Sequence, residues 1–261
     1  MAQDVPTGRS NPTDLGFGVD VGGSGVKGAV VDLNTGSLVG DRIKILTPQP
    51  STPEAVAQTV AQIVERAGWS GPVGVTLPSV VTGGVARTAA NIDRSWIGTD
   101  ARALFTRALG TPEVSVLNDA DAAGLAEDRF GAAKDTDGVV VLLTFGTGIG
   151  SAVLHNGDLL PNTEFGHMEV DGKEAEHRAA SSVKERHDLS YKQWAKEVSR
   201  VLVRFENLLW PDLFIAGGGI SRKHEKWIPL LTNRTPVVPA ELRNAAGIVG
   251  AAYAAKTGLT P

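Results

Sequence analysis

The chain has no cysteine among its 261 residues. This absence excludes disulfide bonds, a thiol nucleophile and cysteine-based zinc sites, and it leaves the redox compartment open. No apolar run is long enough to cross a bilayer, and the polar N-terminal segment lacks the apolar core of a signal peptide. We therefore expect a cytoplasmic protein that does not associate with membranes.

Neither sign of charge dominates the chain. The formal net charge is -4, so we expect no nucleic-acid partner. Hydrophobic residues make up 42% and charged residues 21%, as in an ordinary globular protein, and the length suffices for one large domain or two lobes. Residues 1–14 are polar and contain Pro, Gly, Ser and Asn, which predicts a disordered tail.

A Gly-Gly-Ser-Gly turn at residues 22–25 follows a predicted strand that begins at Leu15 and ends at Asp20. A second β-like run, residues 26–33, comes directly after it. A dinucleotide fingerprint or a P-loop would continue into a helix, so this turn fits neither motif. Backbone N–H groups of such a turn can surround an anion, but an ordinary hairpin turn explains the same residues equally well.

The pattern of the first turn occurs again at residues 138–154. A buried-strand pattern over 138–143 leads into Thr144 and a second Gly-rich turn, and residues 151–154 form another strand-like run. Asp20 corresponds to Thr144, and Gly22 to Gly146, with one gap. This internal repetition indicates a duplicated architecture, in which two facing turns can hold a phosphate chain from either side.

The dipeptide Asn118-Asp119 lies between the two repeats, after a strand-like run over 114–117 and before a helix-like run over 120–130. A carboxylate at the C-terminal end of a strand points into the crevice where α/β proteins bind ligands. We interpret Asp119 as the group that acts on a phosphoryl acceptor. The alternative is a helix cap, for which mutation would reduce stability instead.

Other segments predict a mixed α/β chain. Helices are expected over 52–67, 100–109, 190–209, 221–231 and 244–256, and further strands over 72–77 and 213–216. The three glycines after the last of these strands precede a predicted helix, whose N-terminus can face an anion or a nucleoside. In the loop-like segment 80–96, Asn91 is either a hydroxyl-binding amide or part of an Asx-turn.

Two charged groups lie close together in the second half. Glu164 and His167 flank Gly166 beside Phe165, which suggests a partly buried polar pair. The run that follows, residues 171–186, is rich in both signs of charge and predicts a solvated helix face for most of its residues.

Five of these motifs occur together in one order, at residues 20–28, 117–121, 143–150, 164–167 and 216–220. The set resembles the ROK family of sugar kinases in the actin/hexokinase-like superfamily, and within it the actinobacterial polyphosphate glucokinases and polyphosphate/ATP glucomannokinases. The resemblance runs from about Leu15 to the C-terminus. It implies a two-lobed α/β fold of the ribonuclease H-like type with a duplicated mixed β-sheet. The lobes would be residues 15–117 and 118–261, with the closing helix, about 244–256, packing back on the first lobe.

The resemblance also implies an activity: phosphorylation of glucose, with mannose as a further acceptor, at the 6-hydroxyl by polyphosphate, ATP or both. Asp119 would be the general base, and Asp20 would position Mg²⁺ through water. The expected sugar-binding residues are Asn118, Asp119, Glu164, His167, Glu176 and Asn91. The expected phosphate- and nucleotide-binding residues are Asp20, Gly22, Gly23, Ser24, Gly25, Lys27, Thr144, Gly146, Thr147, Gly148, Gly217, Gly218 and Gly219.

The chain departs from many ROK proteins at residues 171–178, where those relatives carry zinc-binding cysteines. We therefore expect no zinc, and a His167 that is free to bind a sugar hydroxyl. Monomer and homodimer, the preferred donor and the use of mannose stay open. For a longer polyphosphate track, the following residues are candidates by charge alone, and each is better explained as an ordinary surface residue: Arg42, Lys44, Arg94, Arg102 and Arg107.

Two other classes of function are compatible with parts of the pattern. A sugar-responsive repressor of the ROK type would need a DNA-binding helix-turn-helix, for which the fourteen residues before Leu15 are too few. A catalytically inert sugar-binding regulator would keep Asn118 but would need neither Asp119 nor the two Gly-rich turns. Another actin-like ATPase would not account for the motif from Glu164 to His167.

Overall fold

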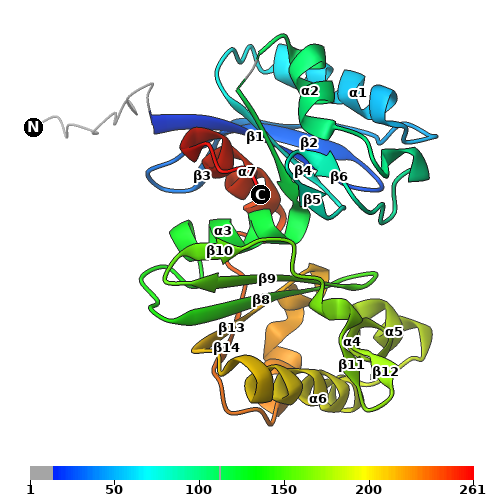
Figure 1. Cartoon of the computed structure of the whole chain (residues 1–261). Helices are drawn as coiled ribbons and strands as arrows, with labels where there is room; N and C mark the ends of the chain where they lie inside the picture. The colour runs from blue at the N-terminus through cyan, green and yellow to red at the C-terminus, as the bar shows by residue number, and fades with distance from the viewer. Residues whose placement is uncertain (1–13, 112) are drawn as a thin grey trace, which may run out of the picture.

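The computed structural model describes residues 14–111 and 113–261, and the disordered tail expected at residues 1–14 lies outside these ranges apart from Asp14. Two five-stranded sheets organise the chain, one in each half (Figure 1). None of the helices within the described ranges is long and apolar enough to span a bilayer.

The first sheet has the strand order β3-β2-β1-β4-β7. β1, β2 and β3 form an antiparallel meander, and β4 and β7 extend the sheet parallel to β1. The strands are β1 (Leu15–Val21), β2 (Val26–Asp32), β3 (Ser37–Ile45), β4 (Val73–Leu77) and β7 (Val114–Asn118).

The second sheet repeats this plan with the order β10-β9-β8-β13-β14. Its strands are β8 (Val139–Phe145), β9 (Ile149–His155), β10 (Asp158–Leu160), β13 (Leu213–Gly217) and β14 (Val237–Pro239). The two Gly-rich turns are closed by equivalent strand pairs. Val21 pairs with Val26 across the first turn, and Phe145 pairs with Ile149 across the second. The predicted duplication is therefore confirmed.

Helices cover both faces of each sheet (Figure 1). On the first sheet, α1 (Pro53–Arg66) and α2 (Ala101–Leu109) cover one face, and α7 (Ala246–Thr257) covers the other. On the second, α3 (Asp119–Phe130) packs on one face, and α4 (Ala175–Ala179) and α6 (Tyr191–Leu209) pack on the other. Each hydrophobic core therefore lies between a sheet and the helices that cover it.

Short elements complete the described chain. They are the hairpin strands β5 (Val81–Thr82) and β6 (Val85–Ala86), the hairpin strands β11 (Glu169–Val170) and β12 (Lys173–Glu174), helix α5 (Ser181–Arg186), and the 3₁₀ segments η2 (Arg94–Trp96), η3 (Phe165–His167), η4 (Gly219–Lys226), η5 (Ile228–Leu230) and η6 (Arg243–Ala245).

The two inner helices, α3 and α7, lie between the two sheets, and each packs against the sheet of the other half of the chain. α3 follows β7 of the first sheet but packs against β9, whereas α7 follows β14 of the second sheet but packs against β1 and β4. Small residues allow this close approach. A Cβ atom on Gly18 of β1 would lie 1.8 Å from a carbonyl oxygen of α7, and one on Gly250 of α7 would lie 1.8 Å from a carbonyl oxygen of α3. The halves therefore share one continuous helical layer.

The structure differs from the sequence predictions in two places. The helix expected at residues 221–231 is wrong: η4 and η5 occupy this stretch, with non-helical angles at Lys223. Pro229 has no backbone N–H group and so cannot donate the hydrogen bond that a continuous α-helix would need there, and Trp227 packs edge-on against Trp194. Strand β3 was not predicted, because it is an edge strand with mostly exposed residues, in which apolar and polar positions alternate only over the last four residues.

A buried carboxylate joins the two inner helices. Glu127 of α3 has no exposed surface. Its oxygens accept hydrogen bonds from the backbone N–H groups of Ala132 (2.9 Å), Glu241 (3.0 Å) and Leu242 (2.8 Å). Because Glu241 and Leu242 lead into α7, this carboxylate fixes where the final helix begins.

We expect Glu127→Ala to lower the free energy of unfolding by roughly 3 kcal/mol, because three partly buried backbone N–H groups would each lose a charged hydrogen-bond acceptor at about 1 kcal/mol. Urea denaturation measures the change. Glu241→Ala, in the same connection, is the matched control, since its side chain is exposed. Equal stability of the two variants would contradict the assigned role of Glu127.

Candidate active site

A cavity of about 730 Å³ opens between the two halves. The ends of two parallel strands of the first sheet contribute to its wall, with Ser79 after β4 and Asp119 after β7. The second half contributes the Gly-rich turn after β8, together with Glu164 and His167. A cavity of this size with several convergent polar groups is typical of a small-molecule site.

Asn118 caps helix α3. Its Oδ1 atom accepts hydrogen bonds from the N–H groups of Ala120 (2.8 Å) and Asp121 (3.1 Å), and its Nδ2 donates to the Ser79 carbonyl oxygen (3.1 Å). Asn118 thus provides the cap that the alternative interpretation assigned to Asp119. Asp119 is the first residue of the helix, and its side chain is exposed to the cavity.

The pKa of Asp119 is raised to about 6. Surrounding protein limits hydration of the carboxylate, which is the largest cause, and the negative charge of Asp20 adds to it. The N–H group of Ala120, 2.9 Å from Asp119 Oδ1, opposes the increase. Near neutral pH the carboxylate is therefore ionised and more basic than an ordinary aspartate, which suits a general base.

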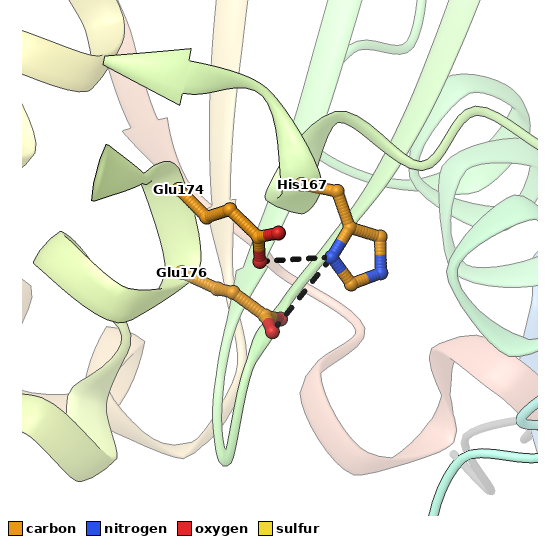
Figure 2. A group of neighbouring side chains, drawn as sticks. All are labelled: His167, Glu174 and Glu176. Carbon is orange, nitrogen blue, oxygen red and sulfur yellow. Dashed lines mark hydrogen bonds and ion pairs between the residues drawn. The ribbon is translucent and has the colours of Figure 1, made fainter. Parts of the chain in front are cut away.

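Carboxylates surround the imidazole of His167 (Figure 2). Its Nδ1 atom lies 3.2 Å from Glu174 Oε2 and 3.9 Å from Glu176 Oε1, and its Nε2 atom lies 3.8 Å from Glu164 Oε2. The side chains of Glu164 and His167 are 45% and 57% exposed, so protein covers each of them in part, as predicted. The intervening Phe165 packs against Phe205, which turns the two polar side chains toward the cavity.

Glu176 connects this cluster to the second Gly-rich turn. Its Oε2 atom accepts a hydrogen bond from the Ile149 N–H group (3.4 Å). A Cβ atom on Gly148 would lie only 2.3 Å from the same oxygen. Glycine at position 148 therefore leaves the space in which the Glu176 carboxylate lies.

The first Gly-rich turn is an ordinary hairpin turn in its backbone hydrogen bonding, with the Gly22 N–H group donating to the Gly25 carbonyl oxygen (3.2 Å). It is not part of the cavity wall. Gly23 adjoins the wall, since a Cβ atom there would lie 3.1 Å from the carbonyl oxygen of Asn91, which lines the cavity.

Asp20 lies beside this turn and is paired on both carboxylate oxygens. Lys27 Nζ lies 3.1 Å from Oδ2, and the Thr76 hydroxyl donates to Oδ1 (3.2 Å). Asp20 is outside the cavity wall, yet its charge raises the pKa of Asp119. The two carboxylates are therefore electrostatically coupled.

The predicted site residues thus divide into two groups. Those that line the cavity are Asn91, Asn118, Asp119, Thr144, Gly146, Thr147, Gly148, Glu164, His167, Glu176 and Gly218. Those outside its wall are Asp20, Gly22, Gly23, Ser24, Gly25, Lys27, Gly217 and Gly219.

Some lining residues were not predicted from the sequence. Ser79 lies two residues beyond the end of β4, close to a strand end as Asp119 is, so the same rule could have identified it. Thr88, Ser151 and Thr163 have no comparable signal: Thr88 lies in the loop-like segment 80–96, Ser151 begins a predicted strand, and Thr163 precedes the motif that starts at Glu164. Glu174 was assigned to a solvated surface, although it contacts His167.

The described residues contain one group of His, Asp or Glu side chains whose ligand atoms are spaced for a metal ion. His167, Glu174 and Glu176 place these atoms within 4.8 Å of one another. A histidine that is hydrogen-bonded to one carboxylate and ion-paired with another has the same spacing, and His167 makes such contacts with Glu174 and Glu176.

A model of the ROK family matches residues 16–182. The matched segment covers 64% of the chain, from 167 of 261 residues, and includes both Gly-rich turns, Asn118-Asp119 and the stretch from Glu164 to His167. The chain belongs to the ROK family.

Several known proteins are similar to this ROK protein along most of its length. The polyphosphate glucokinase of Mycobacterium tuberculosis (strain CDC 1551 / Oshkosh) is 70% identical over 92% of this chain and 90% of its own. The structure of an inorganic polyphosphate/ATP-glucomannokinase from Arthrobacter sp. strain KM matches with a TM-score of 0.87 and 48% identity, over 94% of this chain and 99% of that chain.

A ROK family glucokinase from Streptomyces griseus, in complex with glucose and AMPPNP, matches with a TM-score of 0.80 and 25% identity. The match covers 94% of this chain and 100% of that chain. These structural matches and the two mixed sheets confirm the predicted fold class, the two-lobed actin/hexokinase-like fold.

A second aspartate of this ROK protein is buried behind the cavity. Asp121 has no exposed surface, and its Oδ2 atom accepts a hydrogen bond from the Asn162 N–H group (2.7 Å), whereas Oδ1 has no hydrogen-bond partner among the residues that the structure describes. The Asn162 side chain in turn bonds to the backbone of Val81. Burial raises the pKa of Asp121 to about 7, with the Asn162 bond opposing the shift.

This shift determines how stability depends on pH. The folded-state pKa is raised above that of the unfolded chain, so between about pH 4 and pH 7 the folded state holds the proton and the unfolded state does not. The contribution of Asp121 to stability is therefore lost as pH rises through this window. We expect Asp121→Asn to be more stable relative to the unsubstituted protein at pH 8 than at pH 5.

Thermal unfolding of both proteins at the two pH values measures this difference. An amide at position 121 keeps an oxygen for the Asn162 N–H group, so the main change is loss of the ionisable group. A stability difference that does not change with pH would contradict the raised pKa.

Proposed function

We propose that this ROK protein is a glucokinase that transfers a phosphoryl group from polyphosphate or ATP to the 6-hydroxyl of glucose. The observation that carries the proposal is the position of Asp119, whose carboxylate faces a cavity between a hydroxyl-binding cluster and a Gly-rich turn. The 70% identical polyphosphate glucokinase and the glucomannokinase structure support it. Because the Arthrobacter protein is a glucomannokinase, the match to it also supports mannose as a further acceptor.

Asp119 would act as the base in this transfer. The 6-hydroxyl oxygen forms a bond to the terminal phosphorus, its proton passes to the Asp119 carboxylate, and the bond from that phosphorus to the rest of the donor breaks. Such a reaction depends on alignment and charge stabilisation rather than on covalent chemistry with the protein. The raised pKa of Asp119 favours acceptance of the proton near neutral pH.

The remaining hydroxyls of the sugar would be bound by the cluster on the opposite wall. Glu164 and Glu176 can accept hydrogen bonds from hydroxyl groups, and His167 can donate one. Asn118 has one further amide hydrogen beyond its bond to Ser79, and Asn91 lies on the same wall. A set of charged donors and acceptors suits a sugar, in which most carbons carry a hydroxyl.

The donor would lie along the two Gly-rich turns. The second turn, residues 144–148, lines the cavity, and Gly218 lies on the same wall, where the nucleoside part of ATP would reach Gly217 and Gly219. The first turn, residues 22–25, would contact phosphates further from the sugar, with Lys27 adding positive charge. Residues 15–117 and 118–261 would act as the two lobes.

The residues near Asp119 fit a magnesium ion. Asp20 offers a carboxylate, the kind of ligand that Mg²⁺ prefers, and its charge already raises the pKa of Asp119. A cation there would relieve this repulsion. We propose that Asp20 holds Mg²⁺ through water; the ion, when bound, neutralises charge on the transferred phosphoryl group.

A coupled assay of glucose and mannose, each with ATP and with polyphosphate, tests the proposal. We expect glucose 6-phosphate from both donors. Absence of transfer to either hexose from either donor would contradict it.

We expect Asp119→Asn to lower kcat by about 10²- to 10⁴-fold, because the variant lacks the base but keeps the shape of the side chain. Since Asn118 caps α3, the melting temperature should change little. Calorimetry of glucose binding is the control for an intact site. Loss of stability with most of the turnover retained would instead indicate a structural role.

We expect Gly148→Ala to raise KM for glucose more than Gly146→Ala does. A Cβ atom at position 148 would displace the Glu176 carboxylate, whereas one at position 146 has no atom within 4 Å. Loss of a hydrogen bond to a charged group costs about 1.5–3 kcal/mol, so the increase for position 148 should be roughly tenfold or more. Similar KM values for glucose in the two variants would argue against sugar binding by Glu176.

A further inference from the structure

Glu174 contacts the sugar-binding cluster without lining the cavity. It is the last residue of strand β12, and its Oε2 atom lies 3.2 Å from His167 Nδ1. None of the roles assigned above requires this side chain. Figure 2 shows its carboxylate directed at Nδ1 of His167, whereas Nε2 is the ring nitrogen that lies 3.8 Å from Glu164 Oε2.

We propose that Glu174 is a positioning residue for sugar binding, because its carboxylate accepts a hydrogen bond from the Nδ1–H group of His167. The Nε2–H group of that ring and the carboxylates of Glu164 and Glu176 then remain available to sugar hydroxyls. The inference rests on the proposed function, since it assigns a partner to one of the sugar-binding groups. Glu174 itself makes no contact with the sugar in this arrangement.

Distances favour this division of roles. Nδ1 of His167 is 3.2 Å from Glu174 but 3.9 Å from Glu176, so Glu174 is the nearer acceptor. If Glu174 could not accept, Glu176 would be the next carboxylate within reach of the same nitrogen. His167 would then compete with the sugar for Glu176, which also accepts a hydrogen bond from the Ile149 N–H group.

The backbone holds Glu174 in place. β11 and β12 form a tight hairpin in which Glu169 pairs with Glu174. Asp171 and Gly172 turn the chain between them with positive φ angles. Directly after Glu174, the Ala175 N–H group donates to the Met168 carbonyl oxygen (2.8 Å), one residue beyond His167. The imidazole and its acceptor are therefore both fixed on one short segment, as positioning requires.

The negative charges around His167 also favour the protonated imidazole, which has an N–H group on both ring nitrogens. The groups that face it are Glu164 at the start of η3, Glu174 on β12 and Glu176 on α4, and His177 of α4 lies 3.6 Å from Glu174 and 3.8 Å from Glu176. The hydrogen bond to Glu174 is the largest cause of a raised His167 pKa, which partial burial opposes. The imidazole thus keeps both N–H groups to a higher pH than an ordinary histidine does.

The test is the pH profile of KM for glucose in Glu174→Gln. The substitution keeps the shape and an acceptor oxygen but removes the charge. KM should be lowest where His167 is protonated and should rise as His167 loses its proton. In the variant this rise should begin at a pH lower by roughly 0.2 to 0.7 units, as for loss of an exposed ion pair. We expect kcat and KM for polyphosphate to change little.

The pKa of His167 can also be measured without activity, by NMR titration of ¹⁵N-labelled histidine, with His167→Asn to assign the signal. It should be lower in Glu174→Gln than in the unsubstituted protein. Glu169→Gln is the matched control, because it removes the same charge from the facing strand of the hairpin and has no part in the raised His167 pKa. It should leave both the KM profile and the titration unchanged.

Three results would overturn the proposal. One is a Glu174→Gln variant whose KM profile and His167 titration match those of the unsubstituted protein. Another is a Glu169→Gln variant that shifts both as much as Glu174→Gln does. The third is a stoichiometric divalent ion at His167 in the purified protein, because the ion would then orient the ring. If the protein phosphorylated no glucose, the proposed function would fail, and the titration would still decide whether Glu174 controls His167.

Discussion

The Asn118 side chain makes the three hydrogen bonds on which the site depends. Its oxygen satisfies two N–H groups at the start of α3, and its nitrogen bonds to the Ser79 carbonyl oxygen after β4. The cap fixes the first turn of the helix and also ties together the ends of two neighbouring strands. Because Asn118 supplies the cap, Asp119 need not, and its carboxylate is available to the cavity.

The cavity gathers more negative charge than a stable core would. Burial and the neighbouring carboxylates raise the pKa values of Asp119 and Asp121, and burial raises that of Glu164. Part of this charge is offset locally, by Lys27 at Asp20 and by His167 among the glutamates. Such a concentration of perturbed carboxylates is expected at a catalytic site, where it reduces stability in return for reactivity.

Sequence patterns predicted the local chemistry of the site better than its spatial arrangement. The repeat around the two Gly-rich turns and the strand-to-helix junction at Asp119 could both be identified, because each depends on residues close in sequence. The helix expected at residues 221–231 was wrong, since packing of Trp227 and the constraint of Pro229 determine that stretch. Glu174 was missed because its partner is defined by a hairpin and not by a periodic pattern.

The sequence by itself determined the family, the duplicated plan and the main candidates for catalysis, because ordered motifs and an internal repeat are properties of the chain alone. Only the tertiary structure decided which candidates share one cavity: the second turn lines it and the first does not. It also decided that α3 packs on the second sheet and α7 on the first. α7 approaches β1 at Gly18 and α3 at Gly250, and both contacts are too close for any side chain. Such relations join residues far apart in sequence, and no local pattern records them.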